Sequence, residues 1–468
     1  VTITPGRDYI AGASFVHVLG YTGPQTSENR AQYANQNYDV NEPVGLAGLE
    51  SQYESDLRGT AGFTANEQDA QGHLVTALKT KDPVPGDTLK LAIDSGLQNY
   101  VSDLLTSTMA DARNAAAVVM SPKTGEIYAI VSVPGYDPAI VADPSAHEAE
   151  YTALANDNVH QPLLDHAVSA AAPGSTFKLV TASAALETGH ITPQTSIDIP
   201  SAIYEVKGAN GVIYPLYDWR AQGPGINVYL GIAYSSNIFF YMASCGLYPS
   251  PGLGKDVETS ADILGTYARD YGFGQPTGID LAGESDGVIP SPEWKLRNNS
   301  GDPNWYLADT CFMGIGQGDV KATPVQVARM TAAVANGGKL LTPHVVNQVL
   351  SPDGKVIRDI KPQSTTVPVS AEHLAEIREG MHEGVQLALG AAHRVEETTS
   401  VDVGGKTGTA EFIDTDGVKK QHAWFTGFAP YNDPQVVVTV YYDLGVGGDK
   451  AAPVAGKIFD YFMKNVKQ

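Results

Sequence analysis

Apolar runs near both ends of the chain predict β-strands that could share one sheet. Ala115 to Met120 and Glu126 to Val133 are separated by a Ser-Pro-Lys-Thr-Gly turn sequence and predict a β-hairpin. Near the C-terminus, Ala423 to Phe428 and Gln435 to Asp443 are similarly apolar. We therefore expect one antiparallel sheet closed by N-terminal and C-terminal strands.

Helical spacing of apolar residues dominates the chain between these strands. The predicted helices are Leu97 to Met109, Phe177 to Leu186, Val228 to Ala243, Pro324 to Ala335 and Ala371 to Ala388. Together with the strands they predict an α+β fold, in which an antiparallel sheet carries flanking helices and an inserted helical subdomain.

The first 80 or so residues are rich in Gly, Asn, Gln and Tyr and predict a small irregular lobe with some strand. Within this lobe, Val44 to Gly62 has apolar residues at helical spacing and predicts one amphipathic helix. The Pro/Gly cluster at Lys81 to Asp87 precedes a strand pattern at Thr88 to Ile93. We place the domain boundary there, between a lobe of residues 1–85 and a larger domain of residues 86–468.

Composition and charge argue against several classes of function before any motif is considered. The 468 residues carry a net charge of −22, which repels phosphate backbones, so nucleic-acid binding is not expected. No run approaches the roughly 20 apolar residues that a membrane helix needs, so we expect the chain as given to be soluble. Neither the histidines nor the two cysteines show metal-ligand spacing, and we expect no metal and no cofactor.

The two cysteines, Cys245 and Cys311, do not form a disulfide framework by their number or spacing. The sequence leaves open whether they meet. The interpretation we favour is two separate, small, buried apolar side chains, because free cysteine is among the most buried residue types.

Three short motifs whose side chains could take part in catalysis occur in order along the chain. They are Ser175-Thr176-Phe177-Lys178, Ser235-Ser236-Asn237 and Lys406-Thr407-Gly408. A Ser-x-x-Lys match arises by chance about once or twice in a chain of this length, whereas Lys-Thr-Gly is expected only about 0.1 times. The order and the context of the three motifs therefore carry more weight than any one alone.

Ser175 follows Pro173-Gly174 and precedes an apolar helical run, so we expect it in the first turn of a helix. Backbone N–H groups are unpaired there, and the helix dipole favours a developing anion. Lys178 lies three residues on and shares the same helix face. A serine nucleophile needs a base, and a lysine can serve as one only where burial or a neighbouring cation lowers its pKa.

The Lys406 motif follows two glycines in a strand-like stretch, which is typical of an edge strand that can pair with an extended peptide. Thr407 and Thr409 offer hydroxyls to a substrate carboxylate, and Lys406 offers the charge. Ser235 and Asn237 precede an apolar helix, and they remain an ordinary turn or helix cap unless they face Ser175.

With these motifs, the chain resembles a class B penicillin-binding protein, a monofunctional peptidoglycan D,D-transpeptidase. The resemblance covers nearly the whole chain and includes PGSTFK at Pro173 to Lys178 and the stretch from Tyr271 to Lys295. FVHVLGYTG at Phe15 to Gly23 is most similar to the elongation-type penicillin-binding protein 2 branch. The resemblance implies the penicillin-binding transpeptidase fold, with residues 1–85 as a shortened pedestal or dimerisation-type lobe.

The resemblance also implies a serine acyl-enzyme formed on the D-Ala-D-Ala end of a stem peptide and blocked by β-lactams. Ser175 would be the nucleophile, Lys178 the general base, and Ser235 the proton relay to the leaving D-Ala. Asn237 would bind Lys178 and the substrate amide, and Lys406 would hold Ser235 in a positive field. Thr407, Gly408 and Thr409 would bind substrate, and the backbone N–H groups of Ser175 and Thr409 would form the oxyanion hole.

Further implications concern location, partners and alternatives. The resemblance implies the extracytoplasmic face of the bacterial cell membrane, an N-terminal anchoring helix absent from this chain, and a membrane glycosyltransferase as partner. A D,D-carboxypeptidase is hardly separated from a transpeptidase by sequence. A class D type β-lactamase or β-lactam sensor, and a catalytically idle scaffold, are weaker alternatives.

Overall fold

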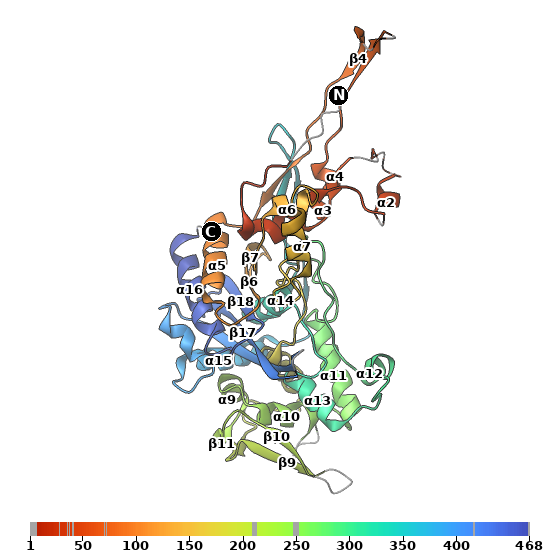
Figure 1. Cartoon of the computed structure of the whole chain (residues 1–468). Coiled ribbons are helices and arrows are strands. Elements are labelled where there is room, and N and C mark those ends of the chain that lie inside the picture. Colours follow the sequence, from red (N-terminus) through yellow and green to blue (C-terminus); the bar gives the residue numbers. More distant parts are fainter. Residues whose placement is uncertain are drawn as a thin grey trace.

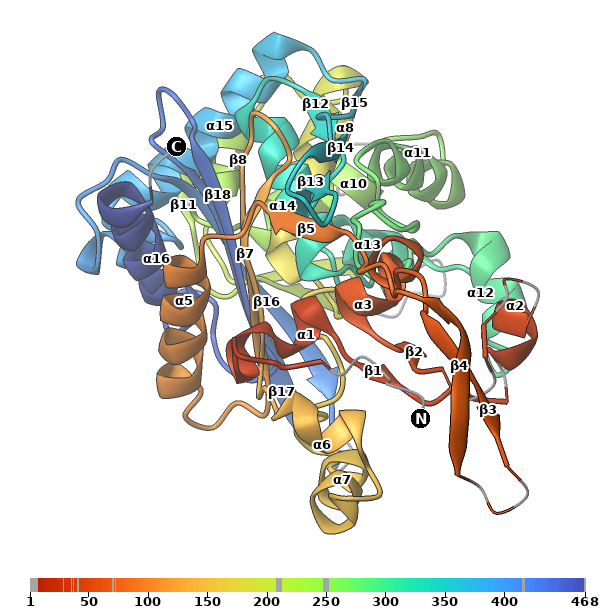
Figure 2. The ribbon, with the colours of Figure 1, turned by 90° about the horizontal axis from the view of Figure 1, so that it is seen from above.

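The computed structural model describes residues 7–466 except 28, 35, 37, 40–41, 70, 72, 208–212, 247–251 and 415–416. At its centre lies a five-stranded antiparallel sheet (Figures 1 and 2). In spatial order its strands are β16 (Gly404–Ile413), β17 (Lys419–Ala429), β18 (Val436–Tyr442), β6 (Ala115–Met120) and β7 (Ile127–Val133). The pairing of β18 with β6 confirms the prediction that strands from both ends of the chain share one sheet.

Helices cover both faces of this sheet, as Figure 2 shows. On one face lie α5 (Ser95–Thr108) and α16 (Ala451–Asn465), whose apolar side chains share a buried cluster with the sheet. On the other lies α14 (Pro324–Ala335), which has the bounds predicted from the sequence. A buried hydrogen bond of 2.7 Å between the hydroxyls of Thr331 and Thr426 joins α14 to β17.

The inserted subdomain is mainly helical, as predicted, and extends to the lower end of the molecule in Figure 1. Its helices are α8 (Lys178–Glu187), α9 (Val228–Ala233), α10 (Asn237–Cys245), α11 (Val257–Asp270), α12 (Pro292–Asn298) and α13 (Leu307–Gly314). It also contains two strand pairs, β8 (Ile197–Ile199) with β11 (Gly223–Ile226), and β9 (Ile203–Lys207) with β10 (Ile213–Tyr217).

The remaining elements of the larger domain surround these two parts. They are β5 (Thr88–Leu91), α6 (Pro138–Ala142), α7 (Glu148–Asn156), β12 (Lys339–Leu341), β13 (Val346–Leu350), β14 (Val356–Asp359), β15 (Ser364–Thr366) and α15 (Ala371–Gln386). Strand β5 pairs with β13, and α15 packs against the edge strand β16. The N-terminal part of the large domain is thereby tied to its middle.

The stretch from Val228 to Ala243 is mainly helical, as predicted, but it is divided into α9 and α10. Ser235 adopts a left-handed backbone conformation with φ of +54°, which stops α9. The Ser236 hydroxyl then accepts a hydrogen bond from the N–H of Phe239 and caps the start of α10. Left-handed φ costs a serine roughly 1 kcal/mol or more, so the surrounding structure must hold it there.

The N-terminal lobe is irregular, as predicted, but its central helix differs from expectation. Val44 begins a strand instead of a helix because it pairs with Gly23. The helical segment then divides at Tyr53 into two short helices. The elements of the lobe are α1 (Val16–Leu19), β1 (Thr22–Gly23), α2 (Arg30–Ala34), β2 (Val44–Gly45), α3 (Gly48–Gln52), α4 (Glu54–Leu57), β3 (Phe63–Gln68) and β4 (Leu74–Lys81).

Specific polar contacts attach the lobe to the larger domain. The Tyr53 hydroxyl donates to Asp280 at 2.9 Å, and Arg358 forms an ion pair with Asp56 at 2.8 Å. The β3–β4 hairpin extends away from the central sheet at the top of Figure 1. The lobe is therefore docked near its α3–α4 segment and projects at its hairpin.

Cys245 and Cys311 form a disulfide, so the interpretation of two separate cysteines is wrong. Both side chains are buried, as expected, but α10 packs against α13 and brings the two sulfurs together. Neither helix encodes this contact locally. Within the described parts of the chain, none of the helices has the length and apolar character required to cross a bilayer.

Candidate active site

The turn that carries Ser175 is held by its neighbours on both sides. Residues Gly174–Phe177 form a short 3-10 turn that leads directly into α8. The N–H of Gly174 donates to the carbonyl of Gly316 at 2.9 Å, and the Thr176 hydroxyl donates to the carbonyl of Pro173 at 2.9 Å. Ser175 itself is half-buried, at the start of a helix as predicted.

Lys178 is fully buried and is bound by the second motif. Its Nζ donates to Asn237 Oδ1 and to the Ser235 carbonyl oxygen, both at 2.7 Å, and lies 3.4 Å from Ser235 Oγ. Burial lowers the pKa of Lys178 to about 7, although the carboxylate of Asp218 acts in the opposite direction. Near neutral pH a substantial fraction of this amine is therefore unprotonated, as a general base requires.

Lys406 approaches the same serine from the edge strand β16. Its Nζ donates to Ser235 Oγ at 2.7 Å and to the carbonyl of Thr407 at 2.9 Å. Burial and the nearby Lys178 both lower the pKa of Lys406. A positive charge on Lys178 therefore disfavours a positive charge on Lys406.

The backbone of β16 lies very close to the backbone of the turn that carries Ser175. A Cβ on Gly408 would lie 2.7 Å from the carbonyl oxygen of Pro173, so only glycine permits this contact. A Cβ on Gly174 would similarly lie 2.6 Å from the carbonyl oxygen of Thr409. The third motif is thereby placed beside the first, on an edge strand as predicted.

The two threonines of this strand have different surroundings. Thr407 is buried and its hydroxyl lies 3.4 Å from the carbonyl of Ala391. Thr409 is half-buried, and its hydroxyl accepts a hydrogen bond from Gly447 N–H at 3.4 Å. Both contacts are long, so either hydroxyl could turn toward a carboxylate.

The structure thus joins four predicted residues by hydrogen bonds and places the fifth beside them. Lys178, Ser235, Asn237 and Lys406 form the linked group. Ser175 lies one turn before Lys178, and within the described residues its hydroxyl makes no hydrogen bond to that amine. Ser235 and Asn237 therefore do more than cap a helix.

Sequence reasoning missed Asp218, a buried carboxylate behind the second motif. It accepts a hydrogen bond from the Ser236 hydroxyl at 2.8 Å. It lies in a loop between β10 and β11 with no motif around it. Only a general preference for pairing buried carboxylates could have drawn attention to it.

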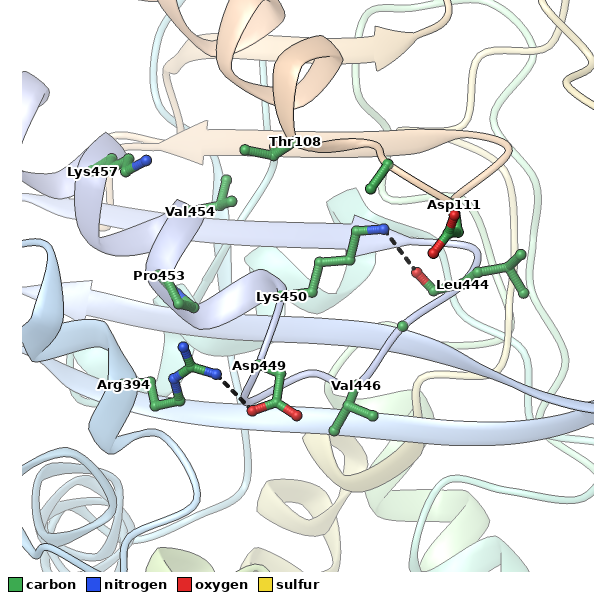
Figure 3. Close-up of a pocket in the computed structure, with 12 residues that line it drawn as sticks. Thr108, Asp111, Arg394, Leu444, Val446, Asp449, Lys450, Pro453, Val454 and Lys457 are labelled. Carbon is green, nitrogen blue, oxygen red and sulfur yellow. Dashed lines mark hydrogen bonds and ion pairs between the residues drawn. The ribbon is translucent and has the colours of Figure 1, made fainter.

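A separate pocket of about 630 Å³ lies between the end of α5 and the start of α16 (Figure 3). Its lining includes Lys450, which donates to the Leu444 carbonyl, and the ion pair of Arg394 with Asp449. None of the predicted site residues lines it. Across the residues that the structure describes, no cluster of His, Cys, Asp and Glu side chains could hold a metal ion.

Comparisons with known proteins cover nearly the whole chain. Residues 115–462 match the penicillin-binding protein transpeptidase domain, and residues 1–91 match the penicillin-binding protein dimerisation domain. The chain is 33% identical to peptidoglycan D,D-transpeptidase MrdA of Haemophilus influenzae, over 98% of this chain and 69% of that protein.

Solved structures agree with these matches. A penicillin-binding protein 2 of Helicobacter pylori, in complex with MreC, is 27% identical with a TM-score of 0.80, over 98% of this chain and 78% of that one. A structure on polymerization and crosslinking by a peptidoglycan synthase complex contains a chain that is 31% identical with a TM-score of 0.80. The match covers 98% of this chain and 77% of that one. The predicted likeness to penicillin-binding protein 2 is confirmed, and the chain belongs to the penicillin-binding protein family of peptidoglycan D,D-transpeptidases.

Proposed function

We propose that this enzyme cross-links peptidoglycan stem peptides through an acyl-enzyme on Ser175. The observation that carries this assignment is the convergence of Lys178, Ser235 and Lys406, whose amines and hydroxyl lie within hydrogen-bond distance beside the serine turn. Such a cluster supplies a base, a relay and a positive field within one small volume.

In the first half-reaction, Ser175 Oγ attacks the carbonyl of the penultimate D-Ala, and its proton passes to the neutral amine of Lys178. The backbone N–H groups of Ser175 and Thr409 bind the oxyanion. The C–N bond to the terminal D-Ala then breaks, and Ser235 relays the proton to the leaving amine. The products are an ester on Ser175 and free D-Ala.

In the second half-reaction, an amine of a neighbouring stem peptide attacks this ester. The amine loses a proton to the Lys178–Ser235 pair, the ester C–O bond breaks, and Ser175 recovers its hydroxyl. The new amide bond is the cross-link. Every proton taken up in one step is returned in another, so the cycle needs no cofactor.

The substrate would bind along the free edge of β16 as an added strand. Its terminal carboxylate would lie near Lys406, Thr407 and Thr409, with Gly408 leaving space between them. A carboxylate there favours the protonated form of Lys406 and so keeps Lys178 neutral. Substrate binding and base activation would thereby reinforce each other.

Intact-protein mass spectrometry after incubation with benzylpenicillin tests the acyl-enzyme. A persistent one-to-one adduct on the Ser175 peptide is expected, because a β-lactam resembles D-Ala-D-Ala and leaves slowly. Rapid turnover without an adduct would indicate a β-lactamase, and no reaction would indicate an idle scaffold.

Transpeptidation is distinguished from carboxypeptidation by an acceptor. A stem peptide ending in D-Ala-D-Ala is incubated with and without an amine acceptor, and the products are separated by mass. We expect the acceptor in the product; release of D-Ala to water alone would favour a carboxypeptidase.

The proposed location is the extracytoplasmic face of the bacterial cell membrane, where an N-terminal helix would anchor the protein. The disulfide of Cys245 with Cys311 supports an oxidising compartment. A membrane glycosyltransferase is the proposed partner, supported by the likeness to the synthase-complex structure. Co-purification of the full-length protein with such an enzyme from membranes would test both points.

A further inference from the structure

Asp218 lies directly behind the second motif and is almost fully buried. One carboxylate oxygen, Oδ2, accepts hydrogen bonds from the Ser236 hydroxyl at 2.8 Å and from the N–H of Ile238 at 3.2 Å. The other, Oδ1, accepts from Trp219 N–H at 2.9 Å and from Gln222 Nε2 at 3.3 Å. Four donors satisfy an ionised carboxylate, and a buried carboxylate held in this way is fixed in position.

These contacts span two separate segments of the chain. The backbone N–H of Asp218 donates to the carbonyl of Ala202 at 2.8 Å, which ties its loop to the start of the β9–β10 pair. Its side chain binds the middle residue of the second motif and the first turn of α10. The neighbouring residue Tyr217 accepts a hydrogen bond from Asn237 Nδ2 at 3.1 Å. The loop therefore holds Ser236 and Asn237 from the same side.

The hydrogen bonds of Asp218 restrain a motif whose backbone is strained. Ser235, in left-handed conformation, would relax unless its neighbours were held. Ser236 is the residue that follows it, and its hydroxyl is bound by Asp218. We propose that Asp218 is a positioning residue for transpeptidation, whose carboxylate holds the Ser235-Ser236-Asn237 turn in place against the two lysines. This inference rests on the proposed function.

The charge of Asp218 has a second effect on the same group. It favours the protonated form of Lys178 and so raises the pKa of that amine, against the larger effect of burial. The other charged or titratable groups around this point are Lys406 on β16, Tyr241 on α10, and Arg220, whose guanidinium lies over the Trp219 ring. Asp218 is thus the carboxylate whose charge acts on Lys178.

Two variants separate positioning from a merely structural role. Asp218→Asn removes the charge and turns an N–H₂ group toward one pair of donors. We expect an acylation rate by fluorescent penicillin at least about tenfold lower at its high-pH plateau. We also expect the midpoint of the acid limb to move about one unit to lower pH, because Lys178 loses its stabilising carboxylate. A general loss of stability would not move that midpoint.

Ser236→Ala breaks the same link from the other side and leaves the charge in place. We expect a plateau rate several-fold lower with an unchanged midpoint, and this variant serves if Asp218→Asn does not fold. The matched control is Asp198→Asn, since Asp198 lies in the same subdomain but, among the residues that the structure describes, its side chain accepts a hydrogen bond only from the N–H of Gly225. The control should keep the wild-type rate and midpoint.

Each outcome is decisive for one of the two proposals. If the wild-type protein is acylated on Ser175 and the folded variants match its rate within twofold and its midpoint, the positioning role of Asp218 is overturned. A control variant as slow as Asp218→Asn would overturn it as well. If the wild-type protein is not acylated on Ser175, the proposed function itself has failed.

Discussion

Lys406 Nζ lies 2.7 Å from Ser235 Oγ, although the two residues are 171 positions apart in the sequence. The same hydroxyl lies 3.4 Å from the amine of Lys178, so one serine is shared by two buried lysines. A hydroxyl between two amines can accept a proton from one side and donate on the other. This geometry suits a proton relay.

Ser175→Ala should abolish covalent labelling by fluorescent penicillin, because the attacking oxygen is lost. Labelling is read as in-gel fluorescence after denaturation. The control is Ser169→Ala: this serine is close in sequence, but its hydroxyl donates to the carbonyl of Asp165. The control should label fully, and stoichiometric labelling of Ser175→Ala would refute the assignment of the nucleophile.

The acylation rate should rise with pH and level off above about 7. Lys178 acts as base only when neutral, and burial lowers its pKa to about 7. Below that pH the amine becomes protonated, so the rate should fall about tenfold for each unit. Stopped-flow measurement of penicillin acylation from pH 5 to 9 gives the midpoint.

A second variant checks which group produces this pH dependence. Lys178→Arg keeps the positive charge but has no neutral form in this range, so acylation should be lost at every pH. Appreciable acylation of the arginine variant with the wild-type midpoint would assign the base to another residue.

Gly316→Ala should slow acylation at least about tenfold, because a Cβ there would lie 2.2 Å from the carbonyl oxygen of Gly174. The clash pushes directly on the Ser175 turn. Gly318→Ala is the matched control: its φ of +67° is close to the +70° of Gly316, but the nearest atom to its Cβ is 3.6 Å away.

Both alanine variants incur the cost of a left-handed backbone, which is about 1 kcal/mol. Thermal unfolding of Gly318→Ala should therefore change only by this amount, whereas Gly316→Ala should lose more stability because of its clash with Gly174. The acylation rates are compared at a temperature at which both variants are folded. Equal acylation rates would mean that the Gly174 contact does not hold the nucleophile in position.

Removing the disulfide should lower the free energy of unfolding by up to about 4 kcal/mol, since the bond closes a loop between residues 66 positions apart. A double variant, Cys245→Ala with Cys311→Ala, is compared with the wild-type protein by denaturant unfolding. Dithiothreitol should destabilise the wild-type protein and leave the double variant unchanged. A wild-type protein insensitive to the reductant, and as stable as the variant, would contradict this expectation.

Much of the fold follows from local pattern. Helix α14 has the predicted bounds because a capping box of Thr323 and Gln326, with Pro324 between them, encodes its start in four consecutive residues. The apolar runs of the main sheet are equally local. Where a distant segment competes, the local pattern fails: Val44 pairs with Gly23 and shortens the predicted helix.

The functional site likewise has features that the local sequence determines and features that only the tertiary structure determines. The sequence by itself determined that Ser175 and Lys178 share a helix start, because three residues make one turn, and that Lys406 lies in a strand near two glycines. The tertiary structure alone decided that Lys406 meets Ser235, that Cys245 meets Cys311, and that Asp218 supports the second motif. These contacts join segments far apart in the chain, and only packing of the helical subdomain against the sheet edge brings them within bonding distance.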